Sequence, residues 1–321
     1  MAYLVKQFLI SASVLVGLGA IAPASSLAAS ITGATIGGTA AYLTYSSNGT
    51  NTFTVANTQA NVQAALDGDS NNPGGNVELF SNSEQSPISP ANIFQSFNAL
   101  YNFLDYNQYT SLSGQIGGQD IVLSSLMATD WFGESAVNSV KTAIASASAI
   151  ANPILKAAAF SAAIAPLYNS PSLAKKWFTD ALSEYGIASN QLLFNTFLLA
   201  GGFQRFSDPN ISYVNQDGGT IKIGLAGHYD AAALLGIPSI PGLPLQASEL
   251  VKVIYGGKTE YKYSFNATQS GLTASDDGIS HNGNYEVTLN AEEVPEPTTM
   301  VGLILGGSGL LAARRKSMKK A

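Results

Sequence analysis

An apolar segment lies near each end of this chain, so any folded core has to be built from the residues between them. The first segment covers residues 8–21, follows Lys6 and is succeeded by small residues. The second covers residues 298–313, carries no charge and is followed at once by a basic cluster. The body between them, residues 30–293, is long enough for one domain with a substantial hydrophobic core or for two small ones.

The N-terminal segment has the order and length of a secretory signal peptide: a basic residue, an apolar stretch and then small residues. We assign residues 1–29 to this signal. Cleavage by signal peptidase is expected after Ala28, because Ser26 and Ala28 supply small side chains at the required positions. An uncleaved N-terminal anchor is the alternative.

The C-terminal segment combines rigid, apolar and basic parts. Pro295-Glu296-Pro297 holds the backbone extended, so a helix or strand before it has to end. The run 298–313 is slightly short for a membrane-spanning helix, which needs about 20 apolar residues and at least roughly 17. Arg314-Arg315-Lys316 begins the basic cluster, and positive charge beside an apolar segment stays on the cytoplasmic side. The body would then lie outside the cytoplasm. A buried C-terminal helix is the alternative, which the glycines of the run disfavour.

These three parts, in this order, resemble the PEP-CTERM sorting signal of bacterial envelope proteins. The resemblance covers residues 294–321 and is supported by the signal peptide at the other end. It implies that a membrane-embedded exosortase recognises and removes the tail. It also implies release or attachment in the cell envelope or outside the cell, often in settings that make exopolysaccharide. It implies nothing about the fold or chemistry of the body.

The composition of the body limits its chemistry and its partners. The chain has no cysteine, so disulfides and thiolate metal sites are excluded. Without the terminal segments, nine basic side chains remain against twenty acidic ones, a net charge of −11. Such an acidic body argues against nucleic acid and against anionic membrane surfaces, so membrane contact is expected only through the terminal segments. Divalent cations and neutral glycans remain compatible.

The hydrophobic patterns predict an α+β fold. Residues 31–56 are rich in Thr, Tyr, Val and Ile, and Asn48-Gly49 between two such runs predicts a β-hairpin. Strand patterns return over residues 211–290, whereas the segment between them has spacings typical of helices. We therefore expect a mixed or antiparallel sheet from N- and C-terminal strands, with a central block of helices packed on it.

The central block is predicted in more detail from its breakers. An Ala-rich insertion at about residues 135–168 predicts a helical hairpin, broken near Pro153 and Pro166. Other helices are expected over residues 89–109, from about 172 to a stop at Gly186, over 191–199 before Gly201-Gly202, and briefly at 247–254; a strand is expected at 120–127, followed by a helix capped by Asp130.

Few residues suggest catalysis. His228 and His281 are the only histidines, and the nucleophile elbow, zinc-peptidase, P-loop and dinucleotide motifs do not occur. Asp130 and Glu134 lie one helical turn apart beside Trp131, which could provide two carboxylates and an aromatic wall for glycoside hydrolysis. The same pattern is also that of an ordinary helix start, where acids are favoured. We assign no catalytic residue.

One loop has the spacing of a calcium site. Asp67, Asp69, Asn71 and Glu78 match positions one, three, five and twelve of an EF-hand loop. Asn72 replaces the glycine of the sharp turn, although Asn tolerates the left-handed conformation better than most residues. A polar surface loop without metal is the alternative. Calcium is the only cofactor that the sequence suggests.

The sequence thus predicts an exported protein with a non-enzymatic structural or interaction role associated with exopolysaccharide. Its expected partners are signal peptidase and exosortase during export, and exopolysaccharide afterwards. The alternative is a secreted polysaccharide hydrolase that works through carboxylates.

Overall fold

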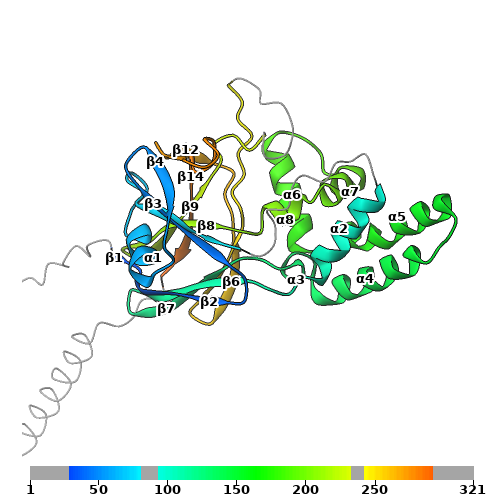
Figure 1. Cartoon of the computed structure of the whole chain (residues 1–321), viewed down its shortest axis with the longest axis horizontal. Coiled ribbons are helices and arrows are strands. Elements are labelled where there is room, and N and C mark those ends of the chain that lie inside the picture. Colours follow the sequence, from blue (N-terminus) through cyan, green and yellow to red (C-terminus); the bar gives the residue numbers. More distant parts are fainter. Residues whose placement is uncertain (1–28, 81–92, 233–241, 292–321) are drawn as a thin grey trace, which may run out of the picture.

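The computed structural model describes residues 29–80, 93–232 and 242–291. The predicted signal peptide, the sorting tail with Pro295-Glu296-Pro297, and the start of the helix predicted over 89–109 lie outside the described residues. Two sheets with a short helix form one part of the molecule, which we call the β lobe, and the remaining helices gather at one end of it as the helical lobe (Figure 1).

The larger sheet, sheet A, has the strand order β12–β14–β9–β8–β5–β3–β4–β13, with β1 pairing with β8 beside this path. Its pairings are antiparallel except that of β13 with β4. Because β1 pairs with β8 and β4 with β13, N- and C-terminal strands share a sheet, and the predicted α+β fold is confirmed. The strands are β1 (Ala29–Ser30), β3 (Tyr42–Ser47), β4 (Asn51–Val55), β5 (Gly75–Leu79), β8 (Asn210–Asp217), β9 (Thr220–Gly227), β12 (Ala267–Gln269), β13 (Thr273–Ala274) and β14 (Gly283–Asn290).

The smaller sheet, sheet B, is antiparallel with the order β11–β10–β7–β6–β2. Its strands are β2 (Thr32–Gly38), β6 (Thr110–Ile116), β7 (Gln119–Ser124), β10 (Val251–Tyr255) and β11 (Lys258–Lys262). Val77 and Ile223 of sheet A share one buried cluster with Leu112 and Val253 of sheet B, so the core of the β lobe lies between the sheets. Helix α1 (Gln59–Leu66) adds Val62, Ala65 and Leu66 to this core.

Two hairpins show how local sequence shapes the sheets. Asn48-Gly49 joins β3 to β4 as predicted: Asn48 Oδ1 accepts from the backbone N–H of Thr50 and Asn51, and Gly49 has a φ of 86°. The helix predicted at 247–254 was wrong: residues 247–250 lie in a loop and residues 251–254 belong to β10. Val251, Val253 and Tyr255 are buried and alternate with more exposed residues along this strand, and the glycines 256 and 257, both with positive φ, turn it back into β11.

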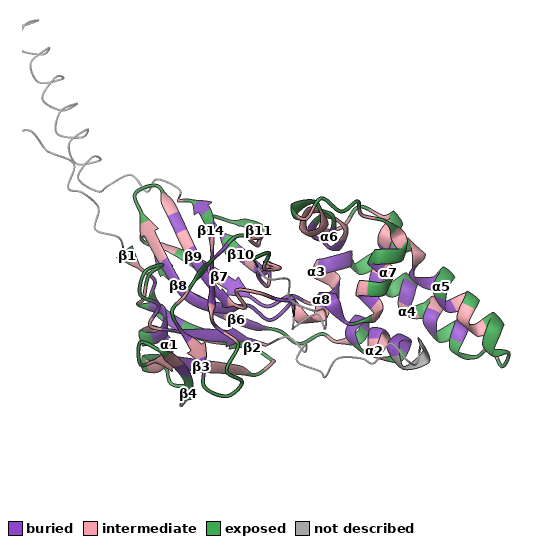
Figure 2. Cartoon of the chain, turned by 90° about the horizontal axis from the view of Figure 1, so that it is seen from above, coloured by how far each residue is buried: buried purple, intermediate pink, exposed green. Residues whose placement is uncertain are grey.

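The helical lobe has a core of its own, rich in aromatic rings. Trp131 lies 5.7 Å from Trp177 and 5.1 Å from Phe203, between ring centroids, and all three are buried. The sequence predicted that the helices pack on a sheet face, but the helical lobe adjoins one end of the β lobe (Figures 1 and 2). Its helices are α2 (Ile93–Asp105), α3 (Ala128–Phe132), α4 (Glu134–Ser148), α5 (Pro153–Asn169), α6 (Leu173–Glu184), α7 (Gln191–Leu199) and α8 (Gly202–Arg205).

The Ala-rich insertion forms the α4–α5 hairpin, with one departure from prediction. Pro153 begins α5, where its missing N–H has no helical partner in any case. Pro166 does not break α5, because it lies in the last turn and its carbonyl still accepts from Ser170 N–H at 3.0 Å. In the described part of the chain, no helix combines the length and apolar character that crossing a membrane requires.

Candidate binding cleft

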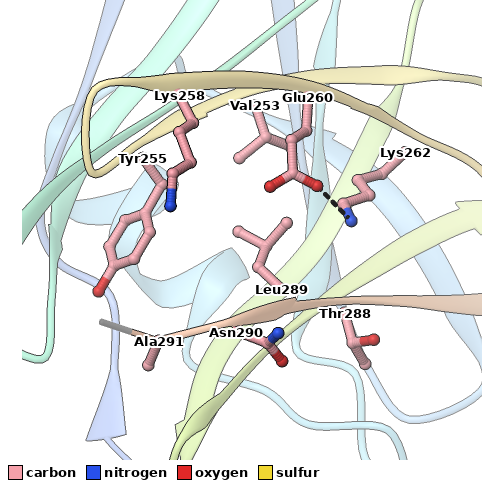
Figure 3. Close-up of a pocket in the computed structure, with 9 residues that line it drawn as sticks. All are labelled: Val253, Tyr255, Lys258, Glu260, Lys262, Thr288, Leu289, Asn290 and Ala291. Carbon is pink, nitrogen blue, oxygen red and sulfur yellow. Dashed lines mark ion pairs between the residues drawn. The ribbon is translucent and has the colours of Figure 1, made fainter. Parts of the chain in front are cut away.

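A cleft of about 400 Å³ opens where an edge of sheet B faces an edge of sheet A (Figure 3). Strands β10 and β11 form one wall and the end of β14 forms the other. We call this hollow the inter-sheet cleft; its lining consists of Val253, Tyr255, Lys258, Glu260, Lys262, Thr288, Leu289, Asn290 and Ala291.

The strand pairing explains why this cleft stays open. Among the described residues β11 pairs with β10 alone, so it is the last strand of sheet B, and its side chains reach the cleft. β12 is short and covers β14 only over residues 283–285, which leaves residues 286–290 without a strand on that side among the described residues. Val253 and Leu289 are buried and close the floor between the two edges. The cleft is therefore a seam of the sandwich with two strand edges as its rims.

Charged and hydroxyl-bearing groups line this seam. Lys258, Glu260 and Lys262 alternate along β11, so the pleat directs them to one side of the strand. Lys262 Nζ lies 2.7 Å from Glu260 Oε2. Figure 3 shows Lys258 beside Tyr255 at one end of the cleft, and Lys262 opposite Thr288 at the other. The lining offers ammonium, phenol and carboxylate groups over an apolar floor, which suits binding of a polar ligand.

The cleft lies at the end of the β lobe where the described chain ends. The backbone N–H of Ala291 donates to Gly219 O at 2.8 Å, and Ala29 pairs with Gln216. Both ends are therefore held by the β8–β9 hairpin. Ala291, the last described residue, lies in the lining of the cleft.

The carboxylates proposed for hydrolysis do not form a site. Trp131 is fully buried and its Nε1–H donates to Ser207 Oγ at 2.8 Å, so it offers no face to a sugar. Asp130 is the third residue of α3, and it caps this helix from that position, because its Oδ2 accepts from the backbone N–H of the N-cap residue Met127 at 2.9 Å. Its side chain, 7% exposed, accepts from Lys252 Nζ and Tyr261 Oη, each at 2.8 Å. Glu134 begins α4 and is exposed. Asp130 therefore links the helical lobe to sheet B of the β lobe.

The three carboxylates with calcium-site spacing have other partners in the structure. Asp67 accepts from Gln63, and Asp69 accepts from the backbone N–H of Asn71 and from the next residue along. Glu78 belongs to β5, where it is buried and accepts from Tyr45 Oη. Among the described residues, no three histidine or carboxylate side chains are placed to share a metal ion.

The loop that contains Asp69 and Asn71 contributes Pro73 to the lining of a small polar cavity on the outer face of sheet A. Asn76 Oδ1, Ser212 Oγ and Asn284 Oδ1 line this cavity without a hydrogen-bond partner among the described residues. Its volume is about 10 Å³, which is close to the room needed by one water molecule. His281 lies on the same cavity with a φ of 64°. Burial lowers the pKa of His281 to about 4, and its Nδ1 lies 2.7 Å from Thr52 Oγ1.

The second histidine has a serine neighbour but not the order of a catalytic triad. His228 Nε2 lies 3.4 Å from Ser280 Oγ, and Ser280 Oγ donates to Asp277. The carboxylate therefore binds the hydroxyl and not the imidazole, whereas a triad orients the imidazole with its acid. Burial lowers the pKa of His228, although Asp277 and Asp230 oppose this shift.

Comparisons with protein-family models, with curated proteins and with solved structures gave no match for this chain. The candidate site therefore rests on geometry. Sequence reasoning missed the inter-sheet cleft, although the alternation of Lys258, Glu260 and Lys262 in one strand pattern was a usable signal. What the pattern lacked was its partner wall, which comes from β14.

Proposed function

We propose that this chain is an exported envelope or extracellular-matrix protein that binds exopolysaccharide in the inter-sheet cleft and acts as a structural or interaction protein. Export through the inner membrane would use the signal peptide and signal peptidase. An exosortase would then recognise Pro295-Glu296-Pro297 and remove the tail.

The observation that carries this proposal is the lining of the cleft. A saccharide presents many hydroxyl groups and weakly apolar ring faces. The Glu260–Lys262 ion pair and the Lys258 ammonium, which lie on the same side of β11, can exchange hydrogen bonds with such hydroxyls. The buried Val253 and Leu289 can receive ring carbons. The acidic, cysteine-free body is compatible with this role.

The test is a glycan array probed with the processed protein from an exosortase-bearing host, with and without Ca²⁺. Lys262→Gln should weaken binding to the retained glycans, because it removes one rim cation and leaves Glu260 without its ion-pair partner. A loss of about 1 kcal/mol, or roughly fivefold in Kd, is expected for one hydrogen bond of this kind.

Lys141→Gln is the matched control. Lys141 has the same side-chain exposure as Lys262, 25%, and also forms an ion pair, but it lies on α4 in the helical lobe. Equal losses in the two variants, or no glycan retained by the folded protein, would remove the cleft as the saccharide site.

A further inference from the structure

The α4–α5 hairpin projects from the helical lobe and reaches farthest from the β lobe (Figures 1 and 2). Asn152 caps α5 at the tip of this hairpin, where its Oδ1 accepts from the backbone N–H of Ile154 at 3.0 Å and of Leu155 at 3.1 Å. The backbone that carries these two residues is therefore held in place before any partner arrives.

Two large aliphatic side chains are presented to solvent at this tip. Ile154 is 78% exposed and Leu155 is 60% exposed. The side of α5 that packs on the helical lobe is formed farther along, by Phe160, Ile164 and Leu167. Ile154 and Leu155 precede that face and add nothing to the core. Adjacent exposed aliphatic residues on a projecting tip are typical of an interaction site.

The tip carries one charge, and this charge is positive. Lys156 is the only charged residue among residues 149–156, within a body whose net charge is −11. Lys156 follows the exposed pair directly. It lines a hollow of about 270 Å³ with Asn98 and Phe160 on the flank of the hairpin. A cation beside exposed aliphatic groups is complementary to a surface that is anionic outside and apolar beneath.

We propose that the tip of this hairpin, residues 149–156, inserts into a phospholipid bilayer that carries anionic headgroups. Ile154 and Leu155 enter the boundary between headgroups and acyl chains, and Lys156 contacts headgroup phosphate. Lipid fits better than an acidic polysaccharide, because a polysaccharide offers no apolar layer for two adjacent aliphatic side chains. This contact is separate from the cleft and from the terminal segments.

Vesicle co-sedimentation of the processed protein tests the proposal. Vesicles of equal parts phosphatidylglycerol and phosphatidylcholine should bind the protein, and pure phosphatidylcholine vesicles should bind it more weakly. Ile154→Ser with Leu155→Ser should lower binding at least about tenfold, because two aliphatic groups no longer leave water. Lys156→Gln should weaken binding to the phosphatidylglycerol vesicles and leave the phosphatidylcholine result unchanged.

Leu192→Ser is the matched control, since Leu192 is 76% exposed and lies on α7 of the same lobe. Phe194 of α7 packs against Tyr168, which is 14 residues from Ile154 along α5, or about 21 Å. The control should bind vesicles like the wild type. Ile154, Leu155 and Leu192 are exposed and Lys156 is half-buried, and circular dichroism reports whether each variant is folded.

Three results would overturn the proposal: no binding of the folded wild type to either vesicle, an equal loss in Leu192→Ser, or binding to an acidic polysaccharide that the double serine variant loses while vesicles are not bound. Glycan binding at the cleft can fail or succeed independently, because neither Lys262 nor Lys141 belongs to residues 149–156.

Discussion

Replacement of Asp130 should lower the stability of the fold, because its carboxylate joins the two lobes. Asp130 lies on α3 of the helical lobe, while Lys252 and Tyr261 belong to β10 and β11 of sheet B. Three donors converge on its carboxylate: Lys252 Nζ and Tyr261 Oη at 2.8 Å each, and Met127 N–H at 2.9 Å. Burial, together with the hydrogen bond to Asp130, raises the pKa of Tyr261, so the phenol remains a donor at neutral pH.

The expected cost of Asp130→Ala follows from what it leaves behind. The carboxylate is 7% exposed and the Lys252 side chain is 25% exposed, so an ammonium group remains partly buried without its partner. Breaking a buried ion pair costs about 3–5 kcal/mol, and partial exposure of Lys252 places this case near the lower limit. About 3 kcal/mol corresponds to a Tm lower by roughly 6–10 °C in a body of this size.

Thermal unfolding followed by circular dichroism measures this shift. Asp105→Ala is the matched control, because its carboxylate is 58% exposed and pairs with Lys141 on the surface. A surface pair contributes about 0–1 kcal/mol, so the control should lower Tm by at most about 3 °C. Lys252→Met in the Asp130→Ala background should recover part of the loss, since the unpaired charge is gone. A Tm for Asp130→Ala no lower than that of Asp105→Ala would refute the inference that Asp130 stabilises the fold by linking the two lobes.

Three further predictions follow from the described geometry and the sequence. The pKa of His281 is about 4 in the fold and about 6.5 when unfolded, so the unfolded chain binds more protons between these pH values. The free energy of unfolding should therefore fall by up to about 3 kcal/mol as the pH drops from 7 to 4. In His281→Asn, which tolerates the positive φ, the midpoint of urea unfolding should change less with pH over this range than in the wild type. Gly75→Ala should lower the yield of folded protein sharply while Gly118→Ala costs about 1 kcal/mol, because only at Gly75 would a Cβ meet Tyr45 O, at 2.0 Å, though both have positive φ; equal effects would contradict this. Mass spectrometry of the protein exported by an exosortase-bearing host should show a start near Ala29 and an end close to Pro295-Glu296-Pro297. Replacement of these three residues by alanine should abolish the C-terminal cut, and intact peptides through Arg314 as the main extracellular form would contradict the prediction.

The sequence was informative where local chemistry decides the structure. Asn48-Gly49 predicted its hairpin because a tight turn needs residues that accept positive φ, and Gly186 ended α6 for the same reason. Residues 247–254 were predicted as a helix and not as a strand because the spacing of their apolar residues fits both the helical period and the strand period. Pairing of β10 with β7 on one side and β11 on the other decided the outcome, and that is tertiary information.

The candidate sites were harder to predict for a related reason. Glu78 had calcium-loop spacing, but Val77 and Leu79 face the core, so the pleat turns Glu78 to the opposite face of sheet A. Trp131 suggested a sugar platform and is buried, because neighbours from α6 and α8 surround it. The inter-sheet cleft joins residues 253–262 to residues 288–291, and only the stacking of two sheets brings these segments together.

The positions of the two described ends bear on the proposed processing. Strand β1 pairs with the end of β8 through Ala29 and Gln216, and β14 pairs with β9 along its whole length up to Asn290 and Thr220. Both expected cleavage points fall outside these strands in the sequence. Processing would therefore leave the described strands and the hydrogen bonds between them intact. The processed chain should keep both cores. Ala29 and Ala291, the first and last described residues, both contact the β8–β9 hairpin, on the side of the β lobe away from the α4–α5 tip (Figure 1).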